Sequence, residues 1–406
     1  LSHDQFRRAA GIARELDRPE LPARAAVGMR SYGDNTRPDA ETVRLLEGAL
    51  ESVGDGFPVW RARILSRLTY CAPHTESMET RLRLSEEATR LTADSVDPAV
   101  LFDVFVGRYW ATLGPDALDE RIAVGSEATE TGRRLGDPRL VLLGPDTLVG
   151  AHRVLGEFDA VNQHVDAFGE IASTLRQPFF EFHGLILQIV YAMNCGRFDG
   201  AEALLARAAE RGKDSVEDLD ALSAGIKFWL RDMRGETTDP SEAEDILQAI
   251  GDRLMSSSTG TDQIVKASII EVLLSVGQQD EARRQLLELF ESDMEQLSRN
   301  ENWLVTMSLA SSAAIALEEP AIADRLFQLL TPYENLMFVH DHLHVSRGSV
   351  ASSLGALAGV NGREDEAIDR LRAAIAREEA LGAQPAALDS RILLIQQFER
   401  MGRDEA

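Results

Sequence analysis

Residues 350–402 read VASSLGALAGVNGREDEAIDRLRAAIAREEALGAQPAALDSRILLIQQFERMG, and this stretch decides the fold. Apolar residues recur at helical spacing in two segments joined by a tight turn at Gly362, and a third such segment follows a Gly/Pro break. Small residues stand where the first two helices must touch, namely Gly355, Ala358, Ala367 and Ala374. Such a helix pair cannot bury its apolar stripe alone. It therefore stacks on copies of itself, and the stretch predicts an α-solenoid.

Prolines mark the chain at a regular interval. They stand at Pro19, Pro58, Pro98, Pro138 and Pro178, in steps of 39, 40, 40 and 40 residues, and the mark returns at Pro385. Proline fits the first turn of a helix but not its middle, because it has no N–H to donate and its ring clashes with the preceding turn. The interval therefore indicates where each helix pair begins.

Glycines give a second, independent series. Each of four glycines precedes an acidic or polar turn that leads into the next helix: Gly156, Gly196, Gly277 and Gly362. Their separations of 40, 81 and 85 residues are one, two and two periods with small insertions. Glycine adopts the left-handed conformation that ends a helix, and we expect the aspartate that follows to cap the next one. The two series agree on a period near 40 residues.

The two series place nine helix pairs between two single helices. The pairs run near 21–53, 58–93, 98–135, 138–175, 178–212, 217–254, 262–291, 301–330 and 346–381, and the single helices near 3–16 and 385–401. No stretch alternates apolar and polar residues strongly enough to predict a strand. We therefore expect an all-α solenoid of about ten helix pairs. It should run from residue 1 to residue 406 as one continuous body, with irregularities at 235–261 and 331–347.

The two ends of the sequence are half-pairs. The first helix resembles the second member of a pair, and the last resembles a first member. The last helix carries Ile392, Leu393, Ile395 and Phe398, which without a successor would show an apolar face to water. We expect the sequence to be a segment of a longer array or of a multidomain protein.

Composition limits the possible partners and compartments. With 44% hydrophobic and 27% charged residues the chain can build a core. Its formal net charge of -25 repels nucleic acid and anionic lipid, so we expect neither direct nucleic-acid binding nor membrane binding. There is no span of about 20 apolar residues. Cys71 and Cys195 lack disulfide or metal-site spacing and are interpreted as two thiols in a reducing cytoplasm.

The run HDHLH, residues 340–344, is the most chemically suggestive stretch. If it is extended, His340, His342 and His344 point to one side and could bind a metal ion, with Asp341 behind them. If it is helical, the imidazoles scatter and form no site. The alternative is that these histidines are solvated or take part in structural hydrogen bonds.

Motifs for catalysis and cofactor binding are absent from the sequence. It contains no GxxxxGK[ST] loop, no GxGxxG after a strand, no GxSxG elbow and no HExxH. The many carboxylates lie on amphipathic segments, where they form a solvated face. We therefore expect no enzymatic activity and no cofactor.

A solenoid binds its partners on the inner lining, which the first helix of each pair usually forms. The polar residues that the sequence places there are Arg108, Tyr109, His152, His183, Asn194, Lys227 and Arg231. They could receive a peptide, an acidic group or another domain. The alternative is that each belongs to the ordinary polar surface. Trp110 and Trp303 are interpreted as packing residues.

The spacing of Gly355, Gly362, Ala367 and Ala374 resembles the tetratricopeptide consensus, lengthened from about 34 residues to about 40. RYWATLGPDALDERIAVGSEA (108–128), the NENWL around Trp303 and the GREDEAIDRLRAAIAREEALGAQP block look like the C-terminal helical arrays of large bacterial signalling ATPases. These are LuxR-type transcriptional regulators and ATPase-bearing class III adenylate cyclases. The resemblance implies a right-handed tetratricopeptide-like superhelix that senses an effector or holds an ATPase closed. The sequence lacks the ATPase, cyclase and helix-turn-helix modules.

Three functional hypotheses follow. The first is the regulatory, protein-interaction and effector-sensing array of a signalling ATPase or transcriptional regulator. Its partner would be a protein, a peptide or another domain of the parent protein, with a small-molecule effector as a further ligand. The second is a free-standing tetratricopeptide-type adaptor. The third is a metal sensor built on His340, His342 and His344.

Overall fold

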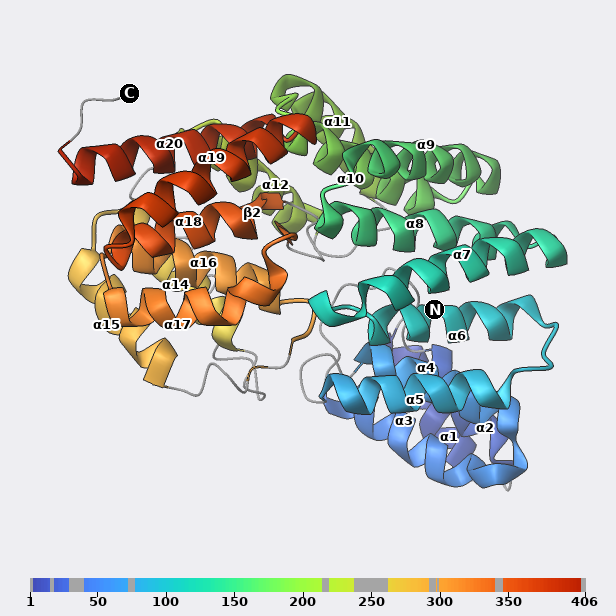
Figure 1. Cartoon of the computed structure of the whole chain (residues 1–406). Helices are drawn as coiled ribbons and strands as arrows, with labels where there is room; N and C mark the ends of the chain where they lie inside the picture. The colour runs from blue at the N-terminus through green and yellow to red at the C-terminus, as the bar shows by residue number, and fades with distance from the viewer. Residues whose placement is uncertain are drawn as a thin grey trace.

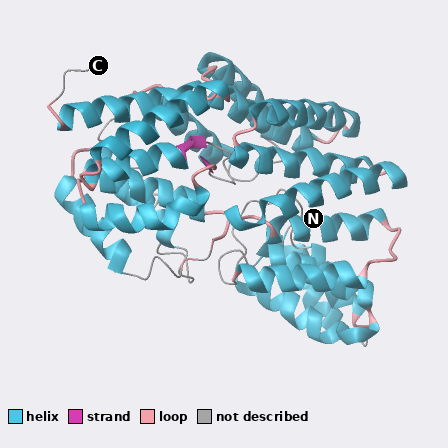
Figure 2. Ribbon diagram, viewed as in Figure 1, coloured by secondary structure: helices cyan, strands magenta, loops and turns pink. Residues whose placement is uncertain are grey.

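The computed structural model describes residues 3–14, 18–28, 40–71, 77–213, 219–236, 262–291, 297, 299–339 and 346–402, and most of them are helical (Figure 1, Figure 2). The helices are α1 (His3–Arg14), α2 (Glu20–Gly28), α3 (Ala40–Val53), α4 (Pro58–Cys71), α5 (Met78–Leu91), α6 (Pro98–Ala111), α7 (Leu118–Leu135), α8 (Pro138–Leu155), α9 (Phe158–Leu175), α10 (Pro178–Asn194), α11 (Phe198–Gly212), α12 (Leu219–Met233), α14 (Asp262–Ser275), α15 (Gln279–Glu291), α16 (Trp303–Ala316), α17 (Pro320–Leu330), α18 (Val350–Val360), α19 (Glu364–Ala380) and α20 (Gln384–Arg400). The predicted all-α helical array is confirmed.

The prolines and glycines stand where the period predicts. Pro58, Pro98, Pro138 and Pro178 are the first residues of α4, α6, α8 and α10. The glycines after α7, α8, α10, α14 and α18 all have φ between +70° and +78°. Only glycine adopts this conformation without steric cost, so each one ends its helix and reverses the chain.

The predicted role of the aspartates after these glycines is wrong. Asp159, Asp199 and Asp365 lie within the first turn of their helices, and no side chain caps α9, α11 or α19. A carboxylate there still interacts favourably with the positive end of the helix dipole. Side-chain caps occur instead before the prolines: Asp97 accepts from the Ala99 N–H at 2.9 Å, and Asp137 from the Arg139 N–H at 2.8 Å.

The 40-residue period reflects how neighbouring first helices pack. Arg63 on α4 donates from Nε to Oδ2 of Asp103 on α6 at 2.6 Å, and Arg67 donates from Nη2 to Oδ1 at 2.8 Å. A Cβ on Gly107 would lie only 2.9 Å from the Cα of Ser66, so these helices approach closely at that point. Residues one period apart therefore meet side by side.

Glycines also bring α7 and α8 together. A Cβ on Gly132 would lie 2.5 Å from the Val141 nitrogen, and one on Gly144 would lie 2.7 Å from the Gly125 oxygen. The predicted contact between α18 and α19 follows the same principle, because a Cβ on Gly355 would lie 2.8 Å from Cγ of Leu371. Small residues at such crossings let the backbones of paired helices touch.

The helices form two arms that meet in the middle of the molecule (Figure 1). We call residues 3–236, α1 to α12, the N-terminal arm and residues 262–402, α14 to α20, the C-terminal arm. Four apolar clusters lie wholly in the N-terminal arm. The largest cluster fills the C-terminal arm and takes only Leu118, Val154 and Phe158 from the N-terminal arm among its fully buried members.

A short antiparallel hairpin replaces helix in the region expected to be irregular, 331–347. Strands β1 (Met337–Val339) and β2 (Ser346–Ser349) pair with Met337 opposite Ser349 and Val339 opposite Ser346. The expectation of no strand is therefore wrong here. Segments of three and four residues are too short to show alternation, and burial of β1 against α8 and α16 stabilises them instead. Of the other predicted irregularity, 235–261, residues 237–261 lie outside the described part of the chain.

The apolar face predicted on α20 is exposed only in part, because Leu393 packs against the largest cluster. Leu388, Ile392 and Ile395 are 55%, 44% and 44% exposed, whereas Phe398 is buried against the protein. Within the described ranges, none of the helices combines the length and apolarity that a membrane crossing requires.

We expect Gly132→Ala to destabilise the protein by about 1–3 kcal/mol, because the new methyl group meets backbone atoms of α8 that cannot rotate away. The matched control is Gly200→Ala on α11, where a Cβ meets nothing within 4 Å. Alanine favours helix over glycine by up to about 1 kcal/mol, so the control should be neutral or stabilising. Urea unfolding measures both, and equal effects of the two substitutions would contradict the close approach.

Buried Glu378 makes stability depend on pH. The Ser349 N–H donates to its Oε1 at 3.3 Å and the Ser390 hydroxyl to its Oε2 at 2.6 Å, but burial raises the pKa of this carboxyl above its ordinary value. A carboxyl with a higher pKa in the folded than in the unfolded chain stabilises the fold as pH falls.

We therefore expect Glu378→Gln to have a higher free energy of unfolding than the native chain. This difference should be largest near pH 7 and shrink toward pH 4.5. Glutamine keeps the shape without the buried charge: its oxygen can accept from the Ser349 N–H, and its amide nitrogen can donate to the Ser390 hydroxyl oxygen. Urea unfolding of both proteins across this range is the test. Stability curves that run parallel would show that Glu378 carries no raised pKa.

Candidate functional site

The residues predicted to line the array lie on four successive first helices. Arg108 and Tyr109 are on α6, His152 is on α8, His183 and Asn194 are on α10, and Lys227 and Arg231 are on α12. Each of these residues therefore lies on the first helix of a pair, as predicted, but their contacts differ from one helix to the next.

Arg108 and Tyr109 belong to a helix-pair contact. Arg108 donates from Nη1 to Oε2 of Glu127 on α7 at 2.6 Å, and its guanidinium lies 5.3 Å from the centre of the Phe105 ring. Tyr109 is half-buried and meets Trp110 edge to face at 6.0 Å. Trp110 is itself buried in an apolar cluster of the N-terminal arm, as its predicted packing role requires.

His152 sits in a polar group at the turn between α8 and α9. Its Nδ1 lies 2.5 Å from Oε2 of Glu157, and its ring stacks on His164 with centroids 5.1 Å apart. Burial, followed by the neighbouring His152, lowers the pKa of His164 below its ordinary value. The lowered pKa favours the neutral form of His164 in this stacked pair.

His183 bridges two neighbouring first helices. Its Nε2 lies 2.8 Å from Oδ1 of Asp146 on α8. The ring also stacks on Phe179 at 6.1 Å and meets Phe168 edge to face at 5.3 Å. Aromatic contacts on the ring and a carboxylate on one nitrogen fix its orientation.

Asn194 faces the C-terminal arm. It is 3% exposed, and its Oδ1 accepts from the backbone N–H of Ser346 on β2 at 3.3 Å. The array's own hairpin therefore occupies this position. On α12, Lys227 is exposed and Arg231 is half-buried.

Two of these residues, His152 and His183, each place an imidazole nitrogen beside a carboxylate. A histidine bonded to a carboxylate is also the geometry of a general base. In both pairs, however, the imidazole ring stacks on a neighbouring ring, which is typical of a histidine that organises packing. Arg108, His152 and His183 each make a polar contact with an acidic residue of their own chain.

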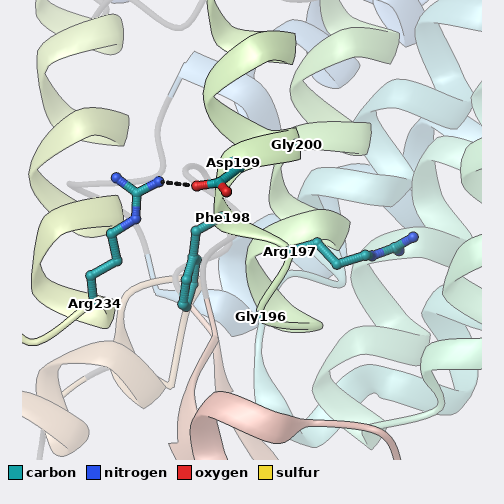
Figure 3. Close-up of a pocket in the computed structure, with 6 residues that line it drawn as sticks. All are labelled: Gly196, Arg197, Phe198, Asp199, Gly200 and Arg234. Atoms are coloured by element: carbon teal, nitrogen blue, oxygen red, sulfur yellow. Dashed lines mark hydrogen bonds and ion pairs between the residues drawn. The ribbon is translucent and has the colours of Figure 1, made fainter.

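A surface hollow of about 370 Å³ lies at the start of α11 (Figure 3). Its lining residues are Gly196, Arg197, Phe198, Asp199, Gly200 and Arg234. Arg234 points toward Asp199 in Figure 3 and donates to it at 3.1 Å and to Glu202 at 3.0 Å. Arg197 points away from Arg234, over the ring of Tyr191 at 4.9 Å. Because Arg234 is already neutralised, the hollow offers a polar surface with an aromatic wall and no uncompensated cation from that residue.

No group of three or more metal-ligating side chains is arranged to hold an ion among the residues that the structure describes. The predicted ligands His340, His342 and His344 lie outside those residues.

Sequence reasoning missed the buried ionic groups. Arg81 and Glu301 are both fully buried and bonded at 2.9 Å, although 220 residues separate them. Nothing local distinguishes either from a solvated charge. Asp103, in contrast, interrupts the apolar run VLFDVFVG one period after Arg63, which is a signal that could have been used.

Comparisons with known proteins add no family. No family model and no curated protein matches the chain. Among solved structures, one described as a circular tandem repeat protein with novel repeat topology and enhanced subunit contact surfaces is 18% identical. The alignment covers 98% of this chain and 89% of that chain with a TM-score of 0.15, a value too low to support any argument. The helices and their packing define the class by themselves, and the chain is an all-α helical repeat protein.

We expect Asp103→Asn to cost about 3–5 kcal/mol, because it leaves the guanidinium groups of Arg63 and Arg67 without their shared buried carboxylate. Glu127→Gln removes the partner of Arg108 in the same way, but Glu127 is 54% exposed and the cost should stay below about 1 kcal/mol. Denaturant unfolding of the two variants is the measurement. Similar losses would mean that Asp103 is not a structural anchor.

Proposed function

We propose that the chain is a non-catalytic scaffold for protein interaction and effector sensing, and that it forms the regulatory array of a bacterial signalling ATPase or transcriptional regulator. The observation that carries the proposal is the succession of helix pairs from α4 to α11, which gives an extended surface. Surfaces of this kind suit extended partners such as a peptide segment or another domain.

The charge of the chain narrows the class of partner. A net charge of -25 attracts basic surfaces and repels acidic ones over long distances. Many arginines are already paired with acids of the chain. A protein partner with a basic contact surface therefore fits better than nucleic acid or an anionic membrane.

The regulatory role rests on the resemblance of the 108–128 and 362–385 stretches to arrays of signalling ATPases. Sensing requires that a bound effector changes the relation of the array to its neighbours. A free-standing adaptor uses the same surface without such a neighbour. The metal sensor stays a hypothesis, because its ligands lie outside the described residues.

Affinity capture from native lysate with the chain as bait tests the interaction role. We expect Lys227→Glu combined with Arg231→Glu to raise the retained amount of a basic partner protein at least about tenfold, since both residues lie on a first helix and the reversal makes that surface more acidic. The control, Arg133→Glu with Arg134→Glu, reverses two exposed charges on the second helix α7 and should leave the retained amount unchanged. Equal retention by both variants would contradict binding at the lining.

The coding sequence upstream of residue 1 distinguishes the regulatory array from the free-standing adaptor. A P-loop ATPase module encoded upstream in the same reading frame supports the regulatory array. A reading frame that begins immediately before residue 1 favours the adaptor.

A further inference from the structure

The C-terminal arm covers one edge of the N-terminal arm. This edge consists of the turns after α6, α8 and α10, residues 112–117, 155–158 and 194–198, which we call the turn edge. All three turns touch the other arm (Figure 1). We call the contact between the turn edge and the C-terminal arm the seam.

The first turn makes the densest polar contacts. The Tyr333 hydroxyl donates to Oδ1 of Asp116 at 2.6 Å, and Arg299 approaches Oδ2 of the same carboxylate at 3.4 Å. Burial, followed by the bond to Asp116, raises the pKa of Tyr333, so the hydroxyl stays a donor. Behind this turn, buried Arg81 bonds to buried Glu301 at 2.9 Å.

The second and third turns touch the C-terminal arm through their glycines. A Cβ on Gly156 would lie 2.9 Å from Cδ1 of Leu381, and one on Gly196 would lie 3.6 Å from Cγ of Pro385. Next to the third turn, Asn194 accepts from the Ser346 N–H. Contact therefore continues along the whole turn edge.

The apolar part of the seam belongs to the largest cluster, against which partly buried Leu155 and Tyr191 of the N-terminal arm also pack. Leu118, Val154 and Phe158 are the fully buried residues that the N-terminal arm adds to the largest cluster, while each arm has an apolar core of its own. Hydrophobic burial scales with apolar area, and the N-terminal arm has four apolar clusters that lie entirely within it.

The ionic and polar contacts of the seam fix its geometry more than they stabilise it. Removing Arg81 and Glu301 from water costs about as much as their attraction returns. Separation of the arms can return both charges to water, whereas unfolding of an arm must expose its apolar core.

Long-range charge opposes closure. Residues 1–236 contain 28 basic and 38 acidic residues, a net charge of -10, and residues 262–406 contain 13 and 24, a net charge of -11. Like charges on two packed bodies repel each other, and salt screens this repulsion over about 10 Å at 0.1 M ionic strength.

From these observations we propose that the seam is a conformational switch. The two arms are separately folded bodies that part at the seam, and the closed form is the one in which the C-terminal arm covers the turn edge. A ligand with higher affinity for the open form would shift the arms apart. This inference concerns the chain's own conformations and stands whether or not the proposed function holds.

A side chain introduced at Gly114 would clash only with residues of the C-terminal arm. Its φ of 165° is extended backbone that any residue adopts. A Cβ there would lie 2.2 Å from the Arg299 oxygen, and its three nearest atoms all belong to Arg299 and Asn300 of the other arm. Arg121 holds the turn in place by donating to the oxygens of Thr112 and Gly114, so the clash falls on the backbone of Arg299 and Asn300 in the other arm.

The first test compares Gly114→Leu with the control Gly200→Leu, whose Cβ meets nothing within 4 Å. Small-angle X-ray scattering should show a larger radius of gyration for Gly114→Leu only, with helical circular dichroism unchanged. If Gly114→Leu alone stays closed, Glu301→Gln and Asp116→Ala are added to it. A triple variant with the native radius would overturn the proposal, as would loss of helical signal together with opening.

The second test uses the native chain. Amide hydrogen exchange of residues 346–349, which lie at the seam, should be at least about tenfold faster than that of 142–149 in α8 and should accelerate as salt is lowered. Exchange at the α8 rate, or without this salt dependence, would contradict a seam that opens against like-charge repulsion.

Discussion

A pair of helices in this chain has more apolar surface than it can bury by itself, and every other feature follows from the need to cover it. The fully buried Leu140, Leu187 and Leu371 each lie on a helix that packs against others on more than one side. Stacking meets this need only if backbones approach closely, hence the glycines at the crossings. Within each arm the structure is thus built largely from contacts between helices that are neighbours in the sequence.

Periodic features could be predicted from the sequence because their causes are local. Proline excludes itself from a helix interior, and a left-handed turn selects glycine, so Pro138 and Gly156 mark α8 directly. The hairpin at β1 and β2 could not be predicted, because its three- and four-residue strands depend on burial by distant helices. The same holds for the seam, where contacts join residues about 150 to 220 positions apart.

The candidate site was predictable at the level of helices but not of contacts. His183 and Asn194 lie on the expected first helix, yet one bonds to Asp146 and the other to Ser346. Some of these partners were within reach of reasoning, because opposite charges one period apart tend to meet in a stacked array. Arg63 and Asp103 are 40 residues apart, and Asp146 and His183 are 37 apart. Arg81 and Glu301 follow no such rule.

The seam shows how a repeat array can be closed and yet remain separable. Each arm is stabilised by its own core, so closure needs to supply alignment and only modest additional free energy. Buried pairs such as Arg81 and Glu301 suit this role, because they penalise misalignment strongly while adding little net stability. Both arms carry a net negative charge, -10 and -11, and their mutual repulsion reduces the free-energy difference between the closed and the open form. A small free-energy difference between these two forms is the physical condition under which a weakly binding partner can change the shape of the whole chain, since a ligand shifts an equilibrium only by its difference in affinity for the two states.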